Sequence, residues 1–155
     1  PTDAPITLTL VGSDHGGYTE QMQALSARLH LEDKVQFLGS RTDVPQLLQA
    51  ADLFVHPATC QEGFGITLIE AMASGVPCLA FPKGAIPEII GPEIDGFLTE
   101  EVSAAALTAG INRALELFTK APHHWHTLCK NARQKAELFS IERTVAQLEA
   151  LYQEQ

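Results

Sequence analysis

The stretch that decides the fold runs from Glu62 to Pro77 and reads EGFGITLIEAMASGVP. Glycines open it, an apolar run with helical spacing follows, and Ser74-Gly75 with Pro77 ends it. A glycine-flanked loop that opens into a short helix leaves unpaired N–H groups at the helix start, where the helix dipole favours an anion. We expect the backbone amides of this turn to cradle a phosphate or diphosphate. The amides concerned belong to Gly63, Phe64, Gly65, Ile66 and Thr67.

Two carboxylates flank this turn. Glu62 precedes the loop and Glu70 lies about one turn into the helix, with residues 63–69 between them. A carboxylate beside a phosphate pocket repels the phosphate, so Glu70 should face another group; a carboxylate that accepts two hydrogen bonds fits a vicinal diol such as a ribose. Glu62 lies nearer whatever extends beyond the phosphate. The alternative is an ordinary acidic helix start, with Glu62 complementing the dipole and Glu70 solvated.

The rest of the chain predicts strands alternating with helices, followed by helices alone. β-rich runs bounded by glycine or proline predict strands at Ile6–Val11, Val35–Leu38, Leu53–His56, Cys78–Phe81 and Gly96–Leu98. Apolar periodicity predicts helices at Thr19–His30, 43–50, 66–74, Ser103–Phe118, His123–Phe139 and Ile141–Tyr152, with Ser103 and Ser140 as caps, and residues 86–90 form a short helix or a turn. This order predicts an α/β fold with a Rossmann-like parallel sheet and a helical C-terminal segment.

Bulk properties narrow the function. The 155 residues predict a single domain over 1–155, with an α/β core over 1–100 and helices over 101–155. A net charge of −9 argues against sequence-independent binding to nucleic acid or to an anionic membrane. Three scattered cysteines favour a reducing compartment. Ligands of parallel sheets bind at the carboxyl ends of the strands. The 57–65 loop begins at the carboxyl end of a predicted strand, so its placement makes it a candidate binding site.

Several spaced motifs in this chain resemble one family. The stretch EGFGITLIEAMASGVPCLAF is similar to the Glu-x7-Glu signature of family-4 (group 1) retaining glycosyltransferases, which have the GT-B fold. GAIPEII and DGFL resemble the family's next elements, and VQFLGSRTDVPQLLQAADLFVHPA resembles the run that precedes the signature. The resemblance covers roughly Ile6 to Leu98 and is closest to lipopolysaccharide-core glucosyltransferases.

The resemblance implies the C-terminal, donor-binding domain of such an enzyme. Glu70 would bind the ribose of a UDP-, GDP- or ADP-sugar, the amides after Glu62 would hold its diphosphate, and Glu62 would be the catalytic residue at the donor sugar. Ser40, Arg41 and Asp43 would lie near the base, although Asp43 is equally well explained as a helix cap. A hexose would be transferred with retention to a saccharide or lipid-linked acceptor, without metal or cofactor, in lipopolysaccharide or polysaccharide biosynthesis. The implied location is cytoplasmic, peripheral at the inner membrane in the full-length protein.

The chain also departs from the family pattern. Its first strand resembles the family's second, so the Arg and Lys that grip the diphosphate are missing; Lys83 is not at a matching position. The N-terminal acceptor domain, a required partner, is missing as well, and we expect little or no transfer by this chain alone. Because the missing strand is central in the family's sheet, the sheet should show a rearrangement, a gap or self-association. The alternatives are a non-catalytic nucleotide-sugar-binding module and a nucleotide-sugar epimerase, which the signature disfavours.

Other reactive side chains have simpler explanations. His56 and Cys60 could form a nucleophile pair, but no third orienting group is evident and packing explains them better. His123, His124 and His126 lack the i, i+4 spacing of a helical zinc site. Gly12 to Gly17 is not a dinucleotide-binding glycine motif. In the family this loop lies near the cleft, where His15 could face it or point away. Glu88 could orient the donor sugar or simply begin a helix.

Overall fold

The computed structural model describes residues 6–14 and 16–153. The chain divides into two compact units, Pro1–Val44 and Pro45–Gln155, each built on parallel strands. The expectation of one domain over residues 1–155 stays a prediction.

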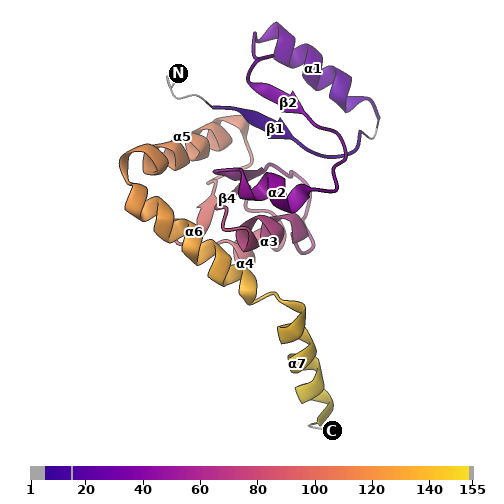
Figure 1. Ribbon diagram of the computed structural model, residues 1–155, viewed down its shortest axis with the longest axis vertical. Helices are drawn as coiled ribbons and strands as arrows, with labels where there is room; N and C mark the ends of the chain where they lie inside the picture. Colours follow the sequence, from indigo (N-terminus) through magenta and orange to yellow (C-terminus); the bar gives the residue numbers. More distant parts are fainter. Residues whose placement is uncertain (1–5, 15, 154–155) are drawn as a thin grey trace. The chain divides into compact units, whose positions relative to one another are not determined.

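The first unit is a single βαβ motif (Figure 1). Its elements are β1 (Leu8–Leu10), α1 (Tyr18–Arg28) and β2 (Val35–Phe37). β1 and β2 pair in parallel, with Leu8 opposite Val35. All three residues of β1 are exposed, so this small sheet has little cover of its own.

The second unit carries the remaining elements, with α2 beginning at the division between the units. In chain order they are α2 (Val44–Gln49), β3 (Phe54–His56), α3 (Ile66–Ala73), β4 (Cys78–Ala80), α4 (Ile86–Ile89), β5 (Gly96–Leu98), α5 (Ala104–Lys120), α6 (Pro122–Glu137) and α7 (Ile141–Gln153). The sheet has the order β3-β4-β5 and is parallel throughout.

The central strand β4 divides the core of the second unit into two clusters. Its three side chains are completely buried and point alternately to opposite faces of the sheet. Cys78 and Ala80 join the cluster around α3, whereas Leu79 joins Phe97 and Trp125 on the other face. The α3 helix packs chiefly on α6, so the helix of the Glu62–Thr67 turn is fixed from both sides.

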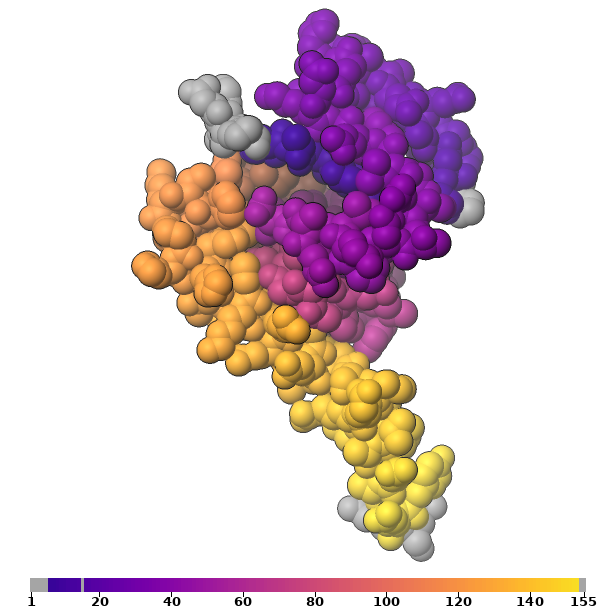
Figure 2. Space-filling view, viewed as in Figure 1, coloured from indigo at the N-terminus to yellow at the C-terminus, as the bar shows by residue number. Residues whose placement is uncertain are grey.

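The C-terminal helices follow the predicted caps. The Ser103 hydroxyl accepts a hydrogen bond from the Ala106 amide at 3.1 Å, and the Ser140 hydroxyl accepts one from Arg143 at 3.3 Å. All of α7 whose side chains are described is exposed, including an apolar stripe of Ile141, Val145 and Leu148. Figure 2 shows α7, in yellow, extending away from the rest of the second unit.

The α/β class, the parallel pairing and the helical C-terminal segment are confirmed, and every predicted element is present within a few residues. The described strands form two separate sheets rather than one. The expected rearrangement, gap or self-association stays a prediction.

Candidate functional site

The turn predicted from the sequence is built around Gly65. This residue is the N-cap of α3 and has a φ of 77°, a left-handed conformation that favours glycine. A β-carbon here would lie 3.0 Å from Leu68 Cδ1 and 3.1 Å from Ile89 Cδ1. Gly65 is therefore required both by the backbone and by the packing beneath it.

Gly63 is different, because the fold does not demand a glycine there. A β-carbon at Gly63 would have no atom within 4 Å. The adjacent Phe64 is 52% exposed and packs edge-on against Phe139, with ring centroids 6.1 Å apart. Gly63 thus leaves open space beside the loop backbone, which is what a ligand approaching the amides needs.

The Glu62 carboxylate occupies part of that amide cradle. Its Oε1 accepts hydrogen bonds from the Gly65 amide at 3.1 Å and from the Phe64 amide at 3.4 Å. The Phe64 N–H, followed by that of Gly65, holds the pKa of Glu62 below its usual range, so this carboxyl is ionised at neutral pH. These hydrogen bonds fit the alternative interpretation of Glu62, in which its negative charge complements the start of α3.

His56, at the end of β3, faces the other oxygen of Glu62. Its Nε2 lies 3.4 Å from Glu62 Oε2 but makes no hydrogen bond, and this nitrogen is buried. Sequence reasoning had considered His56 only with Cys60, and among the described residues no hydrogen bond joins those two side chains. The signal that could have found this contact is the position of His56 at the carboxyl end of a strand.

The loop between β4 and α4 packs against the backbone of Glu62. The Ala85 amide donates to the Glu62 carbonyl at 3.0 Å. Gly84 has a φ of 58°, and a β-carbon there would overlap the Glu62 carbonyl oxygen and lie 2.6 Å from its nitrogen. GAIPEII was recognised as a family motif, but this role of Gly84 was missed.

Glu70 projects from α3 with an exposed carboxylate. Within the described part of the chain this carboxylate has no hydrogen bond or ion pair; its backbone carbonyl accepts from the Ser74 amide and hydroxyl. Thr67 is exposed on the same helix, as its second residue. The Glu70 carboxylate is therefore available for a ligand, as its predicted role requires.

The residues predicted to lie near a base belong to the first unit. Arg41 Nε and Nη2 donate to the two carboxylate oxygens of Asp43 at 2.8 and 2.7 Å. The hydrogen bonds from Arg41 hold the pKa of Asp43 below its usual range. Asp43 thus pairs with a guanidinium instead of capping α2, and Ser40 precedes this pair in an exposed loop.

The remaining candidates stay outside any site. His123, His124 and His126 are exposed on α6, and among residues 6–14 and 16–153 no group of three or more His, Cys, Asp or Glu side chains could hold a metal ion. Glu88 is exposed on α4. His15 lies outside the described residues.

The cysteines give a prediction about thiol accessibility. Burial raises the pKa of the Cys78 thiol, whereas Cys60 is exposed in the loop before Glu62. We expect a thiol reagent at pH 8 to modify Cys60 at least about a thousandfold faster than Cys78, which reacts only through unfolding. Peptide mapping after timed alkylation measures both rates. Comparable rates in the native protein would contradict the buried position of Cys78.

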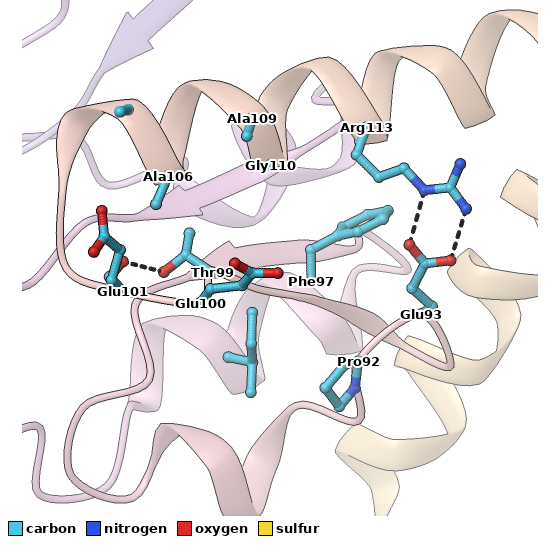
Figure 3. Close-up of a pocket in the computed structure, with 12 residues that line it drawn as sticks. Pro92, Glu93, Phe97, Thr99, Glu100, Glu101, Ala106, Ala109, Gly110 and Arg113 are labelled. Atoms are coloured by element: carbon cyan, nitrogen blue, oxygen red, sulfur yellow. Dashed lines mark hydrogen bonds and ion pairs between the residues drawn. The ribbon is translucent and has the colours of Figure 1, made fainter.

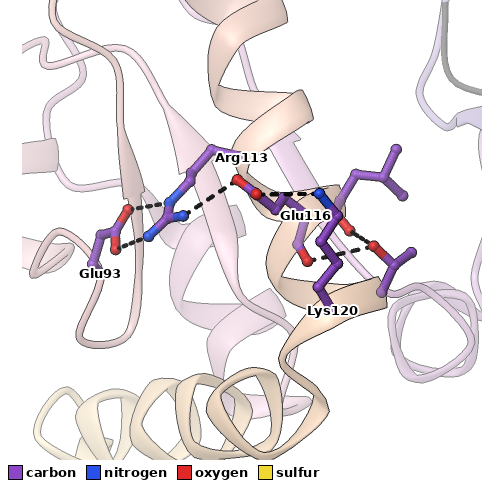
Figure 4. Close-up of polar contacts among 6 residues, drawn as sticks. Glu93, Arg113, Glu116 and Lys120 are labelled. Carbon is purple, nitrogen blue, oxygen red and sulfur yellow. Dashed lines mark hydrogen bonds and ion pairs between the residues drawn. The ribbon is translucent and has the colours of Figure 1, made fainter.

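A separate hollow of about 470 Å³ lies along β5 and the first half of α5 (Figure 3). Its lining contains none of the predicted site residues. Glu93 and Arg113 close one end through two hydrogen bonds of 2.8 Å, and Arg113 also contacts Glu116, which pairs with Lys120 (Figure 4). These four charges pair with one another, whereas Glu100 and Glu101, which also line the hollow, form no ion pair among the described residues.

Solved structures define the class of fold. The chain matches Anabaena HepE in complex with UDP with a TM-score of 0.77 and 32% identity, over 94% of this chain and 41% of that one. HepE has also been solved with UDP-glucose, with a TM-score of 0.76 and 31% identity to this chain over 93% and 40% of the two chains. The fold is that of the C-terminal domain of a GT-B glycosyltransferase.

A family model described as "Glycosyl transferases group 1" matches residues 2–135, and the chain belongs to this family. It is 36% identical to N-acetyl-alpha-D-glucosaminyl L-malate synthase of Bacillus anthracis, over 97% of this chain and 38% of that protein. It is 30% identical to the lipopolysaccharide glucosyltransferase WaaG of Escherichia coli, over 91% and 37%. The chain thus spans less than two fifths of the length of these relatives. No helix among the described residues is long and apolar enough to cross a membrane.

Proposed function

We propose that this chain is the nucleotide-sugar-binding half of a retaining glycosyltransferase that transfers a hexose to a saccharide or lipid-linked acceptor. The observation that carries the proposal is the Glu62–Glu70 turn, in which open backbone at Gly63 adjoins a helix start and a Glu70 carboxylate that has no partner among the described residues. The UDP and UDP-glucose complexes of HepE support a nucleotide-sugar as the ligand.

Each part of the turn has a role in this proposal. Glu70 accepts hydrogen bonds from the ribose hydroxyls, and the amides from Gly63 to Thr67 stabilise the departing diphosphate. Glu62 leaves these amides and contacts the donor sugar near the reacting carbon. The acceptor then attacks from the face that the diphosphate leaves, which retains the configuration.

The proposal includes parts of the enzyme beyond this chain. An N-terminal domain binds the acceptor, and cationic side chains outside this chain complete the diphosphate site, with no metal required. Arg41 and Asp43 lie near the nucleotide base. A cytoplasmic location is proposed on the free thiols of Cys60, Cys78 and Cys129, which fit a reducing compartment. Self-association through the interrupted sheet stays a prediction.

The test is the affinity of this chain for nucleotide sugars, measured by ligand-observed NMR with UDP-, GDP- and ADP-sugars. We expect binding of UDP-glucose, and we expect Glu70→Ala to weaken it at least about tenfold, because two hydrogen bonds to a charged group are lost. Glu149→Ala, which changes an exposed helical glutamate of α7, serves as the matched control and should bind like the wild type.

Two results would contradict the proposal. If no nucleotide sugar binds the wild-type chain, the donor site is wrong as a whole. If Glu70→Ala binds as tightly as Glu149→Ala, the role of Glu70 is wrong. A further test fuses this chain to an acceptor domain and to the cationic residues that the proposal places outside it. If the fusion protein binds a nucleotide sugar but transfers no sugar, a non-catalytic module is favoured.

A further inference from the structure

The two oxygens of the Glu62 carboxylate have different surroundings. Oε1 is held by the Gly65 and Phe64 amides, whereas Oε2 lies 3.4 Å from His56 Nε2. If a diphosphate occupies the amides, as the proposed function requires, Oε1 loses both of its partners. A carboxylate that must then stay beside the sugar needs another group to hold it.

His56 has the position and the unmet bonding capacity for this. Its Nε2 is buried without a hydrogen bond, a state that costs free energy until a partner arrives. The residue is the last of β3, where it lies opposite Ala80 in the parallel ladder, and its ring stacks on Phe54 with centroids 6.3 Å apart. Strand pairing therefore fixes the backbone of His56, and Phe54 supports its ring, while the Glu62 carboxylate, already 3.4 Å away, needs only a small movement to reach it.

We propose that His56 is a positioning residue for Glu62: it receives the Glu62 carboxylate when the donor diphosphate takes the Gly65 and Phe64 amides. This inference rests on the proposed function for the sugar contact, but the pairing of His56 with Glu62 does not. Within the described residues, Glu62 is the only charged side chain within ion-pair distance of His56. The competing explanation is that His56 merely fills space at the end of β3.

The first experiment compares UDP-glucose with UDP as probes of the same chain. Because Glu62 acts on the sugar, His56→Leu should weaken UDP-glucose about five- to tenfold and leave UDP within about twofold. His56→Gln, which keeps an N–H donor at similar reach, should restore most of the affinity. His126→Leu, at an exposed position of α6, is the matched control and should change neither ligand.

A double-mutant cycle separates positioning from space filling. In a Glu62→Gln background, His56→Leu should cause no further loss of UDP-glucose affinity, because its effect passes through Glu62. Additive losses, or equal losses for UDP and UDP-glucose, would overturn the proposal. Urea unfolding of each variant, followed by Trp125 fluorescence, shows whether a loss of binding merely reflects a loss of folding.

A second readout is independent of donor binding. The Gly65 amide resonance of the ligand-free chain reports on the Glu62 carboxylate, so His56→Leu should shift this resonance relative to the wild type, whereas His126→Leu should leave it unchanged. If His56→Leu leaves the resonance unchanged, the pairing is wrong; if it shifts the resonance but UDP-glucose does not bind the wild type, the pairing stands and the proposed function fails.

Discussion

Gly84→Ala should destabilise the second unit by about 2–5 kcal/mol and abolish UDP-glucose binding. The left-handed backbone at Gly84 is unfavourable for alanine, and the added β-carbon would overlap the Glu62 main chain. Relief of that overlap moves Glu62 and, with it, the start of α3. Urea unfolding measures the loss, with the single tryptophan, Trp125, as a buried fluorescent reporter in the same unit.

Gly63→Ala is the matched control for this prediction. A β-carbon at Gly63 meets nothing within 4 Å, so the free energy of unfolding should change by no more than about 0.5 kcal/mol. It should nevertheless weaken UDP-glucose binding, because the methyl group stands where the diphosphate approaches the amides. Equal stabilities for the two variants would contradict the close approach of the 84–85 loop to Glu62.

Leu68→Ala should cost about 2–5 kcal/mol of unfolding free energy. Leu68 is completely buried, and its Cδ1 lies 3.0 Å from the position that a β-carbon of Gly65 would take. Truncation of this side chain therefore leaves a cavity beside Gly65. Ile66→Ala, two residues earlier on the same helix, removes an apolar side chain that is 63% exposed and should cost about 0.5 kcal/mol or less.

The same urea unfolding experiment checks this second pair. A difference of at least about 1.5 kcal/mol between the two variants is expected, from the burial of one side chain and the exposure of the other. If both variants unfold at the same urea concentration, α3 does not bury the face that the structure assigns to it.

The sequence predicted the order of the elements, and the type of all but the short α4, because glycine, proline and serine mark the boundaries clearly. Ser103 caps α5 as expected, and the apolar run from Cys78 to Ala80 forms the doubly buried central strand. These features depend on local patterns or on the chain order, both of which a single sequence displays.

The contacts around Glu62 could not be predicted in the same way. Whether Glu62 bonds to Gly65 and Phe64 or extends outward depends on a rotamer, and a sequence carries no signal for it. The approach of Gly84 to Glu62 joins two loops that follow neighbouring strands, so it emerges only when the sheet is assembled. The pairing of Arg41 with Asp43, instead of a cap on α2, is a similar choice between two local partners.

The position of the Glu62 carboxylate on the Gly65 amide has a consequence for selectivity among anions in solution. The chain carries a covalently attached competitor, whose effective concentration at the amides is in the millimolar range or above by analogy with short linkers. A small monovalent anion such as chloride or acetate must displace it while offering no additional charge. A diphosphate offers more charge and several acceptor oxygens, so the cradle discriminates by multivalency before any side chain from outside the chain takes part. Millimolar acetate should therefore leave the Gly65 amide resonance unshifted, whereas UDP should move it.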